Sequence, residues 1–461
     1  MARSTSSSDE QHAMTRRALI KWSVAAAAAL GVSRTRLFEI LERVAGKGVA
    51  YAAAESSATR LVALSCGNGG LSHFQLFWPQ VDVARARDPR FAWHRIGEER
   101  MVDGTDLPLA IGPDTPWAGL PPERQITGFV CGVTETHVRN VQSTSVLNGN
   151  NVFSIATVLQ SSSMTPVPVV TIGDTSIGSA SRADAIAANV DSVDGFIKLF
   201  DSAASQAGGL LADPDDADLF KRKYDLFREL NRATYRTTQK PAYAIASGAA
   251  TLVGTNHGPA LRITDADLAR YGIDGNTRAN VAELGRALIV TAKAFQADLT
   301  NAVLMPAMTD DPHRHFAGND ASIVPGQLKV VLDAFMADLQ TATDPSTDKP
   351  LADNVVIAIN GDTPKHCLVR DDWPDNTPDN ANLMFIYSAG YLKSGWFGSI
   401  DRRGIVLGAG GDGKPTAYNG VKTARYATAC LAYAIARGNQ RQIAEFTNGV
   451  TVGEGFGRNR G

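Results

Sequence analysis

The sequence RLVALS at Arg60 to Ser65 is a short apolar run of residues that favour strands, and it leads into the glycine-rich turn at Gly67 to Gly70. A buried strand followed at once by a glycine loop is typical of the first strand of an α/β sheet, and the segment after the loop can hold a ligand. We therefore take this strand as the start of the fold and expect functional residues to follow it.

The rest of the chain alternates between strand-like and helix-like segments. Apolar, strand-forming runs lie at 126–133, 167–172, 300–305, 354–359 and 384–388, and helical patterns lie at 152–159, 213–232, 280–296 and 327–339. This alternation predicts an α/β sheet covered by helices on both faces. Irregular stretches near 80–125 and 344–382 have the look of loop insertions over one end of the sheet, where sites are usually built.

The densest cluster of polar side chains runs from Asp310 to His315 and reads DDPHRH. Carboxylate oxygens and imidazole nitrogens at Asp311, His313 and His315 are ligands that suit a divalent metal. A bound metal would polarise a phosphoryl or sulfuryl oxygen. The alternative is a polar surface loop with solvated histidines, and residue types alone leave both open.

A second acidic cluster, Arg370 to Asp375, follows the strand predicted at 354–359. The adjacent carboxylates of Asp371 and Asp372 suit a cation, and they suit a solvated acidic loop equally well. A third candidate comes directly after the first strand, where Ser72 and His73 could be nucleophile and base. Sequence neighbours seldom have that geometry, so His73 has packing as its alternative role.

Other motifs are weaker or absent. His137 and the loop Asn256 to Gly258 are more typical of turns than of ligand sites. The glycines of Gly410 to Lys414 lack P-loop spacing, with Pro415 where a Ser or Thr would stand, and no dinucleotide-binding glycine motif follows the first strand.

The sequence of the amino-terminal region predicts that the protein is exported from the cytoplasm. Thr15 to Lys21 reads TRRALIK and precedes the apolar run Trp22 to Gly31, which is the layout of a twin-arginine leader. The run is shorter than the roughly 20 residues of a spanning helix, so we expect no permanent membrane span. We assign 1–52 to the signal region and 53–461 to one folded domain, placed in the periplasm or outside the cell. The alternative is an ordinary helix that begins with two arginines.

Charge and cysteine content narrow the function classes. Residues 1–52 hold eight Lys and Arg against four Asp and Glu, a net of +4, so the remainder of a chain of net charge −2 carries −6. That mildly acidic surface gives no reason to expect nucleic-acid binding. The four cysteines are widely spaced without a Cys-x-x-Cys pair, which disfavours a structural zinc site.

Taken in order, these segments resemble the exported family known as domain of unknown function 1501, which is sulfatase-like and belongs to the alkaline-phosphatase superfamily. The family's Gly-Gly-Pro-Ser-His-x-Asp-x-Phe-Asp-Pro is similar to GGLSHFQLFWP at Gly69 to Pro79. Its Gly-Arg helix, strand and Trp-Asp-x-His are similar to Gly285-Arg286 and the following Asp311 to His313. Three later family motifs are similar to GDTPK at Gly361 to Lys365, VRDDWP at Val369 to Pro374 and FGSIDRRG at Phe397 to Gly404.

The chain also departs from the family. Gln75 and Trp78 stand where the family has acidic residues, Asp372 replaces a histidine, and Asp362 replaces an arginine. Glutamine is a weak metal ligand and tryptophan is none, so the affinity for a doubly charged cation should fall. Either the metal site is rebuilt from His315, Asp310 and His366, or it is lost.

The resemblance implies a three-layer α/β sandwich with a central, mostly parallel sheet of the alkaline-phosphatase type. It implies a hydrolase of phosphate or sulfate esters that uses zinc, manganese, magnesium or calcium. The metal ligands would be Asp311, His313, Asp371 and Asp372, with Ser72, His73 and His315 as catalytic candidates. The partners expected are the twin-arginine export machinery and a small or polymeric ester. The alternative is a non-catalytic exported binding protein with a degenerate metal site.

Overall fold

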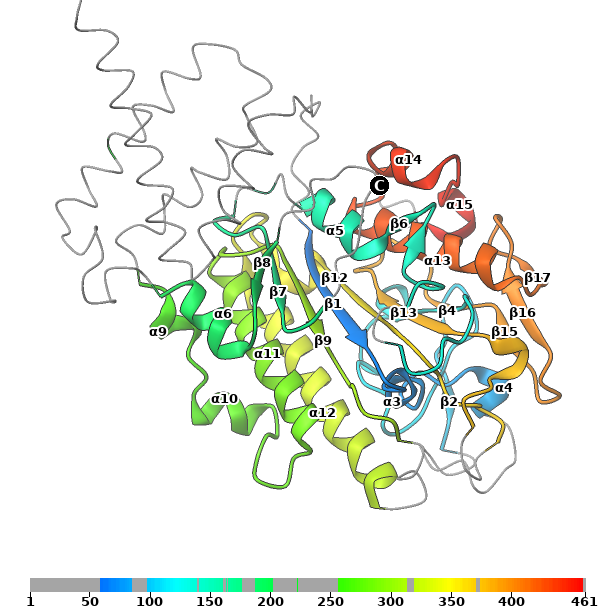
Figure 1. Cartoon of the computed structure of the whole chain (residues 1–461), viewed down its shortest axis with the longest axis horizontal. Helices are drawn as coiled ribbons and strands as arrows, with labels where there is room; N and C mark the ends of the chain where they lie inside the picture. The colour runs from blue at the N-terminus through cyan, green and yellow to red at the C-terminus, as the bar shows by residue number, and fades with distance from the viewer. Residues whose placement is uncertain are drawn as a thin grey trace, which may run out of the picture.

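The computed structural model describes residues 59–84, 98–138, 141–160, 163, 165–175, 187–201, 222, 256–312, 319–369 and 374–458. Its centre is an eight-stranded sheet in the order β14-β4-β13-β12-β1-β9-β7-β8. Figure 1 labels all of these strands except β14. Among the strands described, only β13 runs antiparallel to its neighbours in this sheet. The bounds are β1 Arg60–Cys66, β4 Thr127–Val130, β7 Val169–Ile172, β8 Ala188–Val190, β9 Ala302–Pro306, β12 Val355–Gly361, β13 Leu383–Tyr387 and β14 Gly395–Phe397.

Strand β1 lies inside the sheet, between β12 and β9, and its Leu61 is in register with Val356 and Ala302. Its side chains alternate between two cores. Val62 and Leu64 pack into one, while Leu61 and Ala63 pack into the other. Because both faces are covered, the strand has an unbroken apolar run from Leu61 to Leu64, and this run identified it in the sequence.

Helices cover both faces of the sheet and make three layers (Figure 1). The helices α11 (Ala279–Gln296) and α12 (Asn319–Thr341) pack against each other and supply the first core, together with α6 (Val193–Leu199). The helices α5 (Val152–Gln160), α13 (Gly420–Ile435) and α14 (Gln440–Thr447) supply the second core. The expectation of an α/β sheet covered on both faces is confirmed.

Smaller elements surround the sheet. The short helices are α3 Leu71–Gln75, α4 Val81–Ala84, α9 Gly258–Leu261, α10 Asp265–Arg270 and α15 Gly453–Phe456, with 3₁₀ turns η1 Pro122–Arg124, η3 Leu351–Asp353 and η4 Pro378–Asn380. Small sheets pair β2 Arg100–Met101 with β3 Ala110–Ile111, β5 Val146–Leu147 with β6 Asn150–Asn151, and β10 Thr343–Asp344 with β11 Lys349–Pro350. A three-stranded sheet joins β15 Ser399–Ile400, β16 Val406–Ala409 and β17 Pro415–Ala417.

Several sequence predictions map directly onto this architecture, and others fall outside it. The predicted strands at 60–65, 126–133, 167–172, 300–305, 354–359 and 384–388 correspond to β1, β4, β7, β9, β12 and β13. The segment 344–382 contains β12 and, in its other described parts, the short elements β11, η3 and η4, so it is not one loop insertion. The signal region 1–52 lies outside the described residues, as does the helix predicted at 213–232 apart from Arg222.

Two further properties can be stated for the described part of the chain. None of its helices combines the length and the apolar character that crossing a membrane requires. All four cysteines are buried and none forms a disulfide.

Candidate functional site

Three loops meet at the carboxyl edge of the sheet. The parallel strands β1, β9 and β12 end at Cys66, Pro306 and Gly361, and the loops that follow them bond directly to one another. The Gly67 N–H donates to the Met308 carbonyl at 3.2 Å, and the Gly69 N–H donates to Asp362 Oδ1 at 2.9 Å. Residues that are about 240 to 290 positions apart in the sequence are thereby brought to one edge, which is where α/β proteins place their sites.

Two glycines allow this close approach. Gly69 has φ of +90°, and a Cβ built on it would lie 3.1 Å from Asp311 Oδ1. A Cβ on Gly70 would lie 2.0 Å from the Met308 carbonyl oxygen, which is an impossible contact. Glycine is therefore required at both positions for the loop after β1 to pack against the loop that carries Asp311.

Lys365 is the centre of the site. Its side chain is fully buried, and its ammonium lies 2.8 Å from Asp311 Oδ1 and forms a second ion pair with Asp375. About a quarter of each carboxylate side chain remains exposed, 29% for Asp311 and 25% for Asp375. His137 lies on the more exposed side, with Nε2 at 3.6 Å from Oδ2 of both aspartates. The two carboxylates are therefore held between a buried ammonium and an accessible imidazole.

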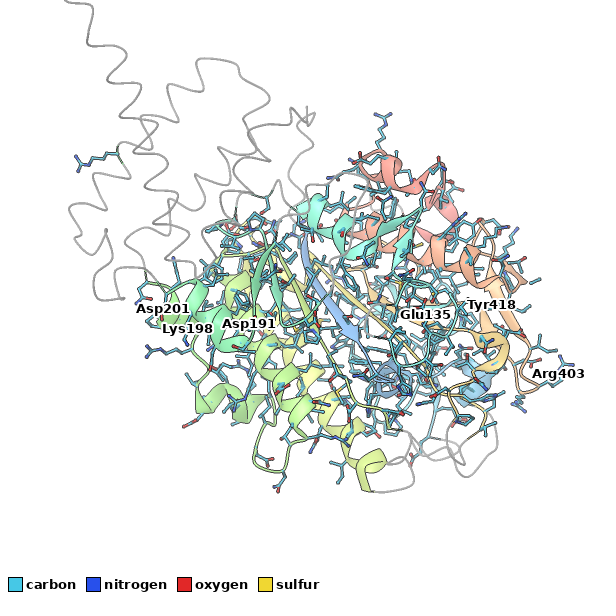
Figure 2. All side chains as sticks on the ribbon, viewed as in Figure 1. Glu135, Asp191, Lys198, Asp201, Arg403 and Tyr418 are labelled. Atoms are coloured by element: carbon cyan, nitrogen blue, oxygen red, sulfur yellow. The ribbon has the colours of Figure 1, made fainter. Side chains whose placement is uncertain are left out.

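The loop after β4 carries His137 and is fastened at several points. The Glu135 carboxylate, labelled in Figure 2, accepts from the backbone N–H of Ser143 at 2.7 Å and from that of Gln142. Tyr418 donates its hydroxyl to the Gly132 carbonyl of the same loop. Thr363 Oγ1 donates to the Glu135 carbonyl at 2.9 Å and accepts from the His137 N–H at 3.2 Å. The imidazole is thus attached to a loop that is tied to the segment after β12.

A second pair of titratable groups lies beside the first. Asp310 Oδ1 is 3.6 Å from His73 Nε2, and its carboxylate accepts from Arg278 at 2.6 Å and from Asn280 at 2.8 Å. Burial alone would raise the pKa of Asp310, but the neighbouring His73, Asn280 and Arg278 hold that pKa well below its usual value. The carboxylate is therefore ionised at neutral pH. The imidazole of His73 is buried, and its Nε2 has no hydrogen-bond partner within the described residues.

Asp362 is a third carboxylate at this edge of the sheet. Its side chain is fully buried and accepts from the Gly69 N–H, and burial raises its pKa above the usual value despite that hydrogen bond. Through its hydrogen bond with the Gly69 N–H, Asp362 joins the loop after β12 to the loop after β1, which is a structural role.

The candidate residues named from the sequence have different outcomes. His73, Asp310 and Asp311 lie together in the site. Ser72 is fully buried in α3, and its hydroxyl donates to the Gly69 carbonyl at 2.5 Å, so it is not presented as a nucleophile. His366 is half-buried, and its Nδ1 accepts from the Leu368 N–H at 3.2 Å. His313, His315, Asp371 and Asp372 lie outside the described residues.

The structure describes only part of the expected metal site, because His313, Asp371 and Asp372 lie outside the described residues. No three His, Cys, Asp or Glu side chains within them converge as a metal site requires. Of the four expected ligands only Asp311 is described, and its two oxygens face Lys365 Nζ and His137 Nε2. A divalent cation at Asp311 would lie beside an ammonium group that already neutralises the carboxylate, which is electrostatically unfavourable.

Sequence reasoning missed Lys365 and Asp375 as partners, and it missed Arg278 and Asn280 altogether. Lys365 lay within a motif quoted for its resemblance to the family, and Asp375 lay within the acidic cluster Arg370 to Asp375, so both signals were present but were not interpreted as an ion pair. His137 was weighed as a turn residue. Its φ of +53° agrees with a turn position, yet the same turn brings its ring between two carboxylates.

Comparisons with protein-family models, curated proteins and solved structures found no match. Function is therefore inferred from the site itself.

Proposed function

We propose that this chain is an exported hydrolase of phosphate or sulfate esters, on a sheet of the alkaline-phosphatase type. The single observation that carries the proposal is the position of His137, an accessible imidazole within 4 Å of both Asp311 and Asp375 at the carboxyl edge of the sheet. Export is supported by the TRRALIK sequence of Thr15 to Lys21 and the apolar run after it.

The chemistry assigned to the described residues is proton transfer. Cleavage of an ester requires a proton for the departing oxygen, and a positioned imidazole is the commonest side chain that supplies one. Asp311 and Asp375 would orient the ring of His137 electrostatically, while Lys365 keeps the two carboxylates in place. No step of this proposal passes through a metal, because three of the four expected metal ligands, His313, Asp371 and Asp372, lie outside the described residues.

A second candidate function, non-catalytic binding, is favoured by a different observation. The ammonium of Lys365 neutralises two carboxylates that would otherwise attract a metal, and the Ser72 hydroxyl is held by the Gly69 carbonyl. Both features are what a site would show after losing its catalytic metal and nucleophile while keeping its fold.

Hydrolysis of 4-nitrophenyl phosphate and 4-nitrophenyl sulfate by the full chain separates the two candidates. The assay should cover several pH values, with and without added zinc, manganese, magnesium or calcium. We expect turnover that falls about 100-fold in His137→Asn, the loss typical of a general acid–base group. The matched control is His257→Asn, which removes a histidine from the turn at the start of α9.

Two results would contradict the proposal of hydrolysis at this site. Turnover that falls equally in His137→Asn and His257→Asn would separate any activity from this site. Absence of turnover in every condition, from protein that unfolds cooperatively, would favour the binding protein.

A further inference from the structure

The carboxyl-terminal segment 401–461 carries a charge opposite to that of the rest of the chain. It holds nine Lys and Arg against four Asp and Glu, a net of +5, whereas residues 1–400 carry −7 within the chain's total of −2. Its described helices and strands, β16, β17, α13, α14 and α15, lie together on one side of the molecule (Figure 1). A charge asymmetry of this kind indicates contact with an anionic partner.

Five exposed cations of this segment lie on the β15–β16 and β16–β17 turns and at the start of α13. They are Arg402, Arg403, Lys414, Lys422 and Arg425. The β16–β17 turn packs against α13, since a Cβ on Gly411 would lie 3.0 Å from the Tyr426 hydroxyl. Arg403 and Lys414 each pair with a carboxylate two positions earlier, but the other three cations form no ion pair within the described residues. Their charge is therefore available to a partner.

Three exposed aliphatic side chains lie among these cations. Val421 is 59% exposed and Ile405 is 48% exposed, and each stands within two positions of an exposed cation. Val133, which is 39% exposed, meets the start of α13, because a Cβ on Gly420 would lie 2.9 Å from its Cγ2. Val133 and Val421 therefore border the same helix end.

The turn η4 connects the two parts of this surface. Its Asn380 carbonyl accepts from the Thr134 N–H at 2.7 Å, and a Cβ on Gly404 would lie 3.8 Å from its Pro378 side chain. Thr134 follows one of the three aliphatic residues, and Gly404 precedes another. The aliphatic residues and the five cations thus form one surface, which we call the cationic face. The turn also brings one exposed carboxylate, that of Asp379, to this face.

We propose that the cationic face binds the surface of an anionic phospholipid membrane. Lys and Arg are attracted to the negative headgroups, and exposed aliphatic side chains gain by entering between them. A nucleic acid would complement the cations, but it would leave Val421 and Ile405 without an apolar contact. Val133 lies on the loop that carries His137, so a bound membrane would lie beside the candidate site. Membrane binding itself does not depend on the proposed hydrolysis.

The experiment is co-sedimentation of the full chain with lipid vesicles. Vesicles of phosphatidylcholine alone are compared with vesicles that contain equal parts of phosphatidylcholine and phosphatidylglycerol. We expect binding to the anionic vesicles that weakens as the salt concentration rises, because salt screens exposed charges. The amino-terminal region is also basic, so the decisive comparison is between variants that share it.

Three variants test the parts of the cationic face separately. Lys422→Gln combined with Arg425→Gln should weaken binding about 30-fold, since each cation near an anionic surface contributes roughly fivefold. Val421→Ser should weaken it about fivefold, because one aliphatic side chain no longer enters the lipid. Asp379→Asn should tighten binding, since it removes a carboxylate that the headgroups repel, and Asn suits the φ of +52° at this position.

The matched control combines Lys198→Gln with Arg286→Gln. Both residues are exposed cations, in α6 and α11 on the opposite face of the sheet from α13, and Figure 2 labels Lys198 on the side of the molecule away from Arg403. The control removes the same amount of charge and should leave binding almost unchanged. Equal losses in the two double variants, or equal binding to both kinds of vesicle, would overturn the proposal. Binding that is unaffected by Val421→Ser, from protein that also binds double-stranded DNA, would overturn it in favour of a nucleic acid.

Discussion

At the scale of a single residue, Lys365 sets the balance of charge in the site. A fully buried ammonium is costly unless it is paired, and two carboxylates contact this one. The pairing also works in the other direction, because Asp311 and Asp375 lie close together only while a positive charge lies between them. An amine from the chain therefore neutralises Asp311, one of the four residues that sequence reasoning assigned to a divalent cation.

Replacing Lys365 with methionine tests whether the close approach of Asp311 and Asp375 depends on the ammonium group. The variant keeps most of the side-chain volume and leaves two carboxylates facing each other. We expect the free energy of unfolding to fall by about 2–3 kcal/mol, somewhat below the roughly 3–5 kcal/mol of a fully buried pair, because both carboxylates are partly solvated. Urea unfolding followed by fluorescence measures this change.

Lys414→Met is the matched control, since Lys414 is 81% exposed and lies 3.6 Å from an exposed carboxylate, that of Asp412. An exposed pair of that kind contributes about 0–1 kcal/mol. Similar small losses in both variants would mean that the Lys365 pairs contribute no more than a surface contact, and the account of the site given above would fail.

Backbone strain gathers in the same place. Thr363 has φ of +46° and His137 has φ of +53°, and the two residues are joined by a hydrogen bond. A β-branched residue rarely adopts this conformation, which costs of the order of 1–3 kcal/mol. The strain is retained where Thr363 joins the loop after β12 to the loop that carries His137.

Helix α10 shows at the scale of an element how one carboxylate joins a local cap to a tertiary contact. Asp267 Oδ2 accepts from the Thr264 N–H at 2.9 Å, while Thr264 Oγ1 accepts from the Asp267 N–H, which completes a capping box. The same oxygen accepts from Lys293 of α11 at 2.6 Å. Burial would raise the pKa of Asp267, but these hydrogen bonds lower it to about 2.

This lowered pKa predicts a defined loss of stability in acid. In the unfolded chain Asp267 titrates near its ordinary value of about 3.9. Its contribution to stability is therefore complete above about pH 4 and is lost as the pH falls toward 2. Urea unfolding between pH 5 and pH 2.5 should show a shallower pH dependence in Asp267→Asn than in the unmodified chain.

Asp265→Asn is the control for the same helix turn. Asp265 is exposed and takes no part in the capping box, so its replacement should leave the pH dependence almost intact. Parallel curves for the unmodified chain and Asp267→Asn would show that this carboxylate does not couple folding to protonation.

The elements that sequence reasoning found best are those buried on two faces. The runs of β1 and β12 are apolar at nearly every position because each side chain enters a core, and such runs are visible without any structure. The short helix α3 was not predicted, since five residues after a glycine turn carry no helical period. The site was predicted in part, with His73 and Asp311 at strand ends, but the pairing of Lys365 depends on contacts that only the folded sheet creates.

In the molecule as a whole, the candidate site and the ion pairs that anchor β1 lie at opposite ends of the same sheet. The candidate site lies at the carboxyl end of β1, and Arg60 lies at its amino end. Arg60 is fully buried and donates to Asp298 and Asp344 at 2.7 and 2.8 Å, and to the Thr300 carbonyl at 2.9 Å. Burial would raise the pKa of Asp344, but the Arg60 guanidinium holds that pKa below its ordinary value. A single side chain thus ties β1 to the turn before β9 and to β10.

Arg60→Met should therefore weaken the entire sheet. The change leaves the fully buried Asp344 without its cation, and removal of one partner from a buried pair costs about 3–5 kcal/mol. Arg403→Met, at a 78% exposed ion pair, should cost less than about 1 kcal/mol. Adding Asp344→Asn to Arg60→Met should recover part of the loss, because the stranded charge is removed with it. Two results would show that the apolar cores anchor the sheet without this ion pair. One is a double variant as unstable as Arg60→Met alone, and the other is a loss of stability in Arg60→Met no larger than that in Arg403→Met. Chemical unfolding of the unmodified chain, the two single variants and the double variant decides between these outcomes.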